Sequence, residues 1–122
     1  MNCSGKTETT AIQLSADNPF NVNLNQPIDY ANVTGDDITE YVDVTIENAT
    51  QEIEILKNQK SLTFENTFVL FDKINNELSK AYSNAHMFFW VSPDSIARAK
   101  GLEGFQKIAP LFYRYLFRQS TF

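Results

Sequence analysis

The chain has 122 residues, of which 43% are hydrophobic and 20% charged, so it has the length and composition of one globular domain and not of a disordered or collagen-like protein. Its 15 acidic residues outnumber the 10 basic ones and give a net charge of −5, which argues against nucleic-acid binding because a phosphate backbone requires a basic face. One Cys and one His are too few for a zinc site and leave no partner for an intrachain disulfide. We therefore predict no catalytic residue, no metal site and no cofactor within this chain.

The N-terminal part is small and polar. We expect residues 1–17 to form a flexible tail and residues 18–36, which contain two prolines, to form an extended lead-in segment. No run matches the ~7–15 apolar residues of a secretory signal or the ~18 consecutive apolar residues of a membrane span, so we expect a cytoplasmic protein. Cys3, followed by Ser and Gly, also resembles the start of a mature bacterial lipoprotein. Anchoring in the periplasm or cell envelope through Cys3 is the alternative if an upstream signal was lost.

A first helix is predicted from about residue 37 to 58. Thr34, followed three residues later by Asp37, resembles a capping box. The segment beyond it is amphipathic, because apolar positions recur at steps of three and four at Ile38, Val42, Thr45 or Ile46, Ala49, Ile53 and Leu56. Most acidic side chains of this segment lie away from that stripe, which indicates a solvated helix face and not an acid–base site.

A second helix is predicted from about residue 63 to 90. Thr63 can cap it, and its apolar positions follow a heptad pattern at Phe64, Thr67, Phe71, Ile74, Leu78, Ala81, Ala85 and Phe88. The link between the two helices is short, so they should pack as an antiparallel hairpin. A parallel coiled coil is the alternative, but the charges beside the seam are poorly complementary.

A third helix is predicted from about residue 95 to 116, after a break at Pro93. Its apolar stripe is weaker than the other two. Gly101 and Gly104 each cost about 1 kcal/mol relative to Ala in a helix interior, and Pro110 should kink or end the helix. The fold class predicted from these elements is all-α, with a long helical hairpin plus a third helix within a helical domain of residues 37–118.

The last twelve residues are crowded with aromatic and apolar side chains. One helix face cannot direct all of them toward a three-helix core, and an exposed patch of this kind usually marks an interface. We therefore predict an interface, either with a missing domain or with a second copy of the chain, formed by Phe112, Tyr113, Tyr115, Leu116 and Phe117.

Two other residues invite a chemical interpretation. His86 lies near the end of the second helix, but nothing in the sequence brings a nucleophile such as Cys3 within hydrogen-bond reach of it. A partly buried helix histidine is the simpler interpretation. Trp90 follows two phenylalanines and could line a ligand pocket, although such a cluster at a helix end is more often part of a core.

The order of three short motifs resembles a known family. The sequence N-P-F at residues 18–20 precedes the first helix, L-T-F-E-N-T at residues 62–67 opens the second, and V-S-P-D at residues 91–94 precedes the third. Over about residues 18–110 the chain is similar to the N-terminal helical segment of the thimet oligopeptidase family of zinc peptidases, which includes oligopeptidase A and peptidyl-dipeptidases. From Leu111 onward it departs from the family pattern, as a truncated reading frame would.

The resemblance implies a large, mostly helical enzyme in which two halves flank a deep channel and an H-E-x-x-H helix binds zinc to cleave short peptides. This chain contains no H-E-x-x-H motif, and His86 matches neither zinc-binding histidine of the family. We therefore expect a non-catalytic fragment that forms part of the channel wall and the substrate-access region, with zinc only in a full-length relative. The alternative is a stand-alone helical module that oligomerises through its aromatic C-terminus.

Overall fold

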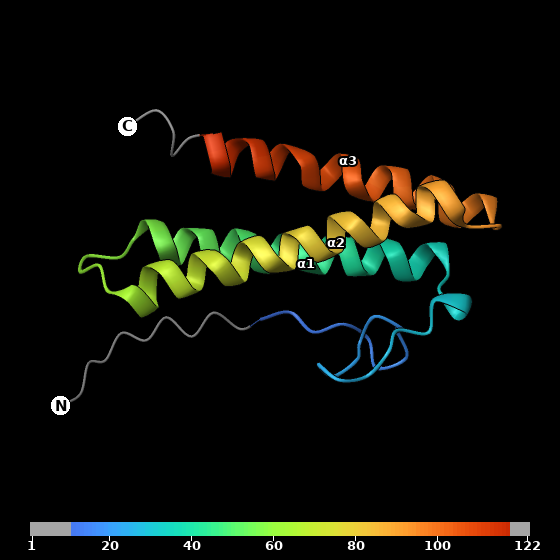
Figure 1. The fold of residues 1–122 in the computed structure, drawn as a ribbon, viewed down its shortest axis with the longest axis horizontal. Helices are drawn as coiled ribbons and strands as arrows, with labels where there is room; N and C mark the ends of the chain where they lie inside the picture. Colours follow the sequence, from blue (N-terminus) through green and yellow to red (C-terminus); the bar gives the residue numbers. More distant parts are fainter. Residues whose placement is uncertain (1–10, 118–122) are drawn as a thin grey trace.

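The computed structural model describes residues 11–117, and three antiparallel helices account for most of them (Figure 1). They are α1 (Gly35–Lys57), α2 (Leu70–Val91) and α3 (Ser95–Phe117). A 3-10 turn, Tyr30–Asn32, precedes α1, and a π turn, Phe64–Val69, leads directly into α2. The described residues contain no strand, so the all-α prediction is confirmed.

The first helix begins two residues earlier than predicted and has the predicted cap. The Asp37 backbone N–H donates to Thr34 Oγ1 over 3.2 Å, and the Thr34 N–H donates back to Asp37 Oδ2 over 2.8 Å. This reciprocal pair satisfies two backbone donors that the first turn would otherwise leave unbonded. The apolar stripe faces the other helices, with buried residues at Ile38, Val42, Thr45, Ala49 and Ile53.

The second helix buries only the later part of its heptad pattern. Five consecutive seam positions are buried, namely Ile74, Leu78, Ala81, Ala85 and Phe88. The prediction was wrong for Phe64, whose side chain is 71% exposed. The first six residues of this segment form a π turn with no buried residue, and its wider i→i+5 bonding breaks the 3.5-residue register on which the pattern depends.

The third helix packs closely against the hairpin at its two glycines. A Cβ atom added to Gly101 would lie 2.5 Å from the carbonyl oxygen of Ala85 and 2.8 Å from the backbone nitrogen of Phe89. A Cβ atom added to Gly104 would lie 2.9 Å from Val42 Cγ2. Gly101 therefore lets the backbones of α2 and α3 approach, and Gly104 leaves room for the side chains of Val42 in α1 and Ala85 in α2. These contacts offset the low helix propensity of the two glycines.

Pro110 was expected to kink or end α3; it does not end it, and the helix passes the predicted end near residue 116. The helix continues to Phe117, although the proline ring removes one backbone hydrogen bond. Leu111 and Phe112 follow directly and pack against the core. Burial of these two side chains holds the last turns of the helix in place.

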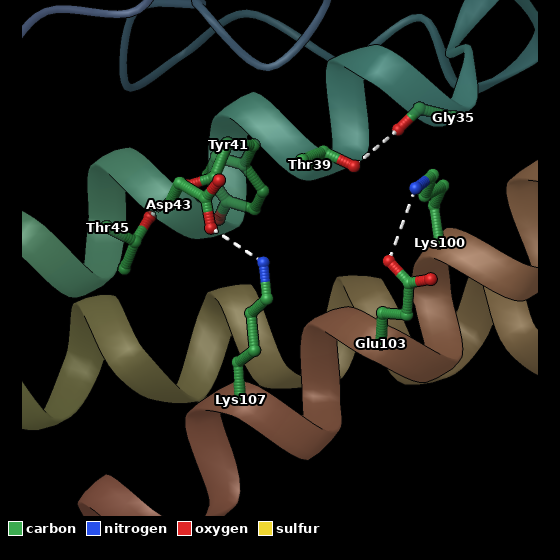
Figure 2. Close-up of polar contacts among 8 residues, drawn as sticks. All are labelled: Gly35, Thr39, Tyr41, Asp43, Thr45, Lys100, Glu103 and Lys107. Carbon is green, nitrogen blue, oxygen red and sulfur yellow. Dashed lines mark hydrogen bonds and ion pairs between the residues drawn. The ribbon is translucent and has the colours of Figure 1, made fainter.

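Polar side chains join α1 and α3 along their solvent side (Figure 2). Lys107 Nζ of α3 lies 3.1 Å from Asp43 Oδ1 of α1, and both side chains are about half exposed, at 49% and 54%. A second pair, Lys100 with Glu103, lies within α3. Exposed pairs of this kind contribute about 0–1 kcal/mol each, so these two add little to the stability of the fold.

Candidate functional site

The largest apolar side chains at the α1–α2 connection point into solvent. We call this group the hairpin-end patch; it consists of Leu62, Phe64, Phe68 and Val69, which are 73%, 71%, 64% and 50% exposed. The rings of Phe64 and Phe68 stack, with centroids 5.6 Å apart and planes 9° from parallel. Contiguous exposed apolar groups mark contact surfaces more often than chance exposure does.

Local sequence chemistry explains why this patch has a defined shape. The Asn66 backbone N–H donates to Thr63 Oγ1 over 3.0 Å, and the Thr63 N–H donates to Asn66 Oδ1 over 2.8 Å. Asn66 Nδ2 also donates to the Ser61 carbonyl oxygen over 2.7 Å, which ties the connection to the π turn. The π turn then stacks Phe64 on Phe68, and such turns are frequent at functional sites. The sequence analysis missed this patch, although Phe68 and Val69 stand outside the heptad pattern and were the available signal.

The predicted C-terminal interface is only partly described. Phe112 is half-buried, and its ring lies 6.1 Å from that of Tyr82 at 88°, so it contributes to the core. Tyr113 is 65% exposed. The side chains of Tyr115, Leu116 and Phe117 lie outside the described residues, as does Cys3. Helix α3 ends toward the same end of the bundle as the hairpin-end patch (Figure 1).

The lead-in segment is anchored on α1 through Asn18, the first residue of the N-P-F motif. Asn18 is 3% exposed; its Nδ2 donates to Glu40 Oε2 over 2.8 Å and to the Asp37 carbonyl oxygen over 3.2 Å. Its Oδ1 accepts from the Phe20 backbone N–H over 3.0 Å. All polar groups of this buried amide are thus bonded, which satisfies the main requirement for burying it. Residues expected in the tail take part too, because Ile12 exchanges two hydrogen bonds with Asn48.

The carboxylate of Glu40 accepts the hydrogen bonds that hold the lead-in segment on α1. Hydrogen bonds from the Ser15 side chain, the Asn18 side chain and the Ser15 backbone hold the pKa of the Glu40 carboxyl below its usual value. Phe20, whose backbone is hydrogen-bonded to Asn18, stacks its ring on that of Tyr41 with centroids 4.2 Å apart. Burial raises the pKa of the Tyr41 phenol, so this ring stays neutral and acts as a packing surface.

The turn between α2 and α3 is held by a side chain from α3. Arg98 Nη1 donates to the carbonyl oxygens of Ser92 and Pro93 over 2.8 and 3.1 Å. Asp94 Oδ1 accepts from the Ile96 backbone N–H over 3.1 Å and caps the start of α3. The V-S-P-D motif therefore specifies both the end of one helix and the start of the next.

The single histidine, His86 of α2, contacts aromatic rings of α2 and α3. Trp90 Nε1 donates to His86 Nε2 over 2.9 Å, and the rings of Tyr82 and Phe105 lie 5.8 and 5.0 Å from the imidazole. Among the described residues, its hydrogen bond and ring contacts bring no nucleophile to it. Within residues 11–114, no group of three His, Cys, Asp or Glu side chains is placed to hold a metal ion. No helix in the described range is both long and apolar enough to cross a membrane.

Comparisons with known proteins give no match. No protein-family model matches the chain, no curated protein matches it, and no solved structure matches it.

Proposed function

We propose that this chain is the N-terminal, non-catalytic helical part of a thimet-oligopeptidase-like zinc peptidase, where it forms channel wall and limits entry to short peptides. The observation that carries the proposal is the order of three family-like motifs, each placed at a junction of the fold. Asn18 anchors the lead-in on α1, Thr63 caps the segment that becomes α2, and Asp94 caps α3. Residues that specify junctions would be retained by any chain built on the same helical plan.

The hairpin-end patch is the surface that would contact the catalytic part of such an enzyme. It directly adjoins the T-F-E-N motif, because Leu62, Phe64 and Phe68 lie in or beside residues 62–67. Two stacked phenyl rings are stiff and bury a large area when a partner covers them, about 150–250 Å² each. Zinc and the water-activating Glu would belong to that partner, so this chain would contribute contact and shape.

A reconstitution assay tests the proposal. The chain is mixed with a thimet-type peptidase from which the corresponding N-terminal segment has been removed, and cleavage of a short fluorogenic peptide is followed with and without a chelator. We expect no chelator-sensitive cleavage by the chain alone and recovery of cleavage in the mixture. The double variant Phe64→Ser, Phe68→Ser should lose this recovery. The matched variant Val91→Ser, Ile96→Ser, altered at the other end of the bundle where both residues are exposed, should keep it.

Two results would overturn the proposal. The first is chelator-sensitive cleavage by the purified chain alone that survives further purification. The second is a mixture that binds the fluorogenic peptide no more tightly, and cleaves it no faster, than the truncated peptidase does by itself.

Self-association is the second candidate, and the exposed Phe64–Phe68 stack favours it because two copies can bury the same patch against each other. Sedimentation velocity distinguishes the two candidates. A discrete dimer or tetramer that becomes monomeric in Phe64→Ser, Phe68→Ser supports a self-assembling module. Loss of assembly only in Tyr113→Asp, Phe117→Asp assigns the interface to the predicted C-terminal residues instead.

A further inference from the structure

The contact between His86 and Trp90 depends on the protonation state of the histidine. The indole Nε1–H can only donate, so His86 Nε2 must present a lone pair to accept this bond over 2.9 Å. The imidazole is then neutral, with its proton on Nδ1. A protonated imidazole has N–H groups at both positions and cannot accept, so protonation breaks this hydrogen bond.

The surroundings keep the histidine in place in either state. The Tyr82 ring stacks on the imidazole at 5.8 Å and 20°, and the Phe105 ring of α3 meets it edge-on at 5.0 Å and 88°. His86 is half-buried between these rings. Aromatic rings also attract a cation at such distances, so a protonated His86 keeps these neighbours. The Trp90 ring also lies 6.0 Å from the imidazole and 5.0 Å from the Phe89 ring, so it stays in place too. What changes is its N–H, which loses its acceptor and is left to solvent because Trp90 is 66% exposed.

The charged groups around this contact are engaged elsewhere. On α2, the neighbour with an ionisable side chain is Tyr82, whose ring stacks on the imidazole. On α3, the charged residues flanking Phe105 are Glu103, which pairs with Lys100, and Lys107, which pairs with Asp43. The ion pairs among the described residues do not include His86. Its protonation is therefore felt mainly by Trp90.

We propose that His86 is a pH-responsive switch that accepts the hydrogen bond of the Trp90 indole N–H when neutral and frees this donor when protonated. The freed N–H adds a hydrogen-bond donor to the surface at the α2–α3 turn, where Val91 and Ile96 are also exposed, at 68% and 62%. The device is independent of the hairpin-end patch and does not rest on the proposed function.

The composition of the chain makes the test direct, because it holds one Trp and one His. A proton–nitrogen NMR spectrum contains a single indole N–H signal, and the imidazole carbon-bound protons report His86 protonation in the same sample. Between pH 8 and pH 5 we expect the indole N–H signal to move upfield with the same midpoint as His86. Circular dichroism should stay constant over the same range.

Two variants make the outcome decisive. His86→Gln keeps a side-chain acceptor but does not titrate in this range, so its indole signal should stay constant from pH 8 to pH 5. His86→Phe removes the acceptor, so its signal should lie at the low-pH position throughout. The proposal is overturned if the wild-type indole signal does not follow His86, or if the same transition persists in His86→Gln.

Discussion

Adding one methyl group at Gly101 tests how tightly α3 is packed on the hairpin. In Gly101→Ala the new Cβ would lie 2.5 Å from the Ala85 carbonyl oxygen, about 0.9 Å closer than the 3.4 Å at which ordinary contact begins. The obstacle is backbone, which cannot rotate away, so α3 must move off α2. Such overpacking costs about 1–3 kcal/mol, whereas the gain in helix propensity is about 1 kcal/mol.

Because the clash is with backbone at 2.5 Å, we expect the upper part of that cost, about 2–3 kcal/mol. After the propensity gain is subtracted, Gly101→Ala should lower the free energy of unfolding by about 1–2 kcal/mol and Tm by roughly 5–10 °C. Urea denaturation followed by circular dichroism measures this. Ala99→Gly, at an exposed position of the same helix, is the matched control and should cost about 1 kcal/mol from propensity alone. A Gly101→Ala protein as stable as the wild type, or more stable, would refute the close approach of the two helices.

Three further changes have defined outcomes. Leu78→Ala truncates a side chain that is 1% exposed and should lower the free energy of unfolding by about 2–5 kcal/mol, measured by urea denaturation. A decrease below about 1 kcal/mol would contradict the burial of Leu78 between the helices. Thr63→Ala removes a cap and should cost about 1 kcal/mol, whereas Thr50→Ala, at an exposed helix position, should cost less. Glu40 has a lowered pKa, so its stabilising effect is present above the unfolded-state value near ~4.3 and is lost as pH falls through the folded-state pKa. Glu40→Gln should thus be less stable than wild type at pH 7, with a gap that narrows toward pH 3; a constant gap would refute the role of the charge.

Periodicity was sufficient to predict the buried faces of α1 and α2, because apart from Gly35 their buried residues are those of the predicted stripes. It predicted the third helix but not its buried face. The expected stripe included Ile96 and Ala99, which are exposed, whereas α3 buries Ala97, Gly101, Gly104 and Ile108. Thr34 and Thr63 were recognisable as caps because capping depends on residues only three positions apart. These signals are local, so a single sequence is enough to show them.

The hairpin-end patch was missed for a local reason, whereas the packing of α3 and of the lead-in segment depends on contacts between distant parts of the chain. The π turn that exposes Phe64 leaves no signal in the periodicity of the sequence, because Phe64 occupies an ordinary position of the heptad pattern. The low helix propensity of Gly101 could be seen in the sequence. The close approach of the α2 backbone, which compensates for it, could not. The anchor between Asn18 and Glu40 joins residues 22 positions apart, and no spacing rule links an amide in a loop to a carboxylate on a helix.

The attachment of the lead-in segment has a consequence for the order of folding. The helical hairpin closes through a short connection, whereas Ile12 must find Asn48 across 36 positions and gains few buried side chains by doing so. Closing a loop over that span is slower than pairing the two helices, and it buries fewer side chains. The bundle should therefore assemble first and the lead-in dock last, as a separate unit of lower stability. In native-state hydrogen exchange the amide of Ile12 would then exchange through an opening that leaves the core of α1 and α2 closed.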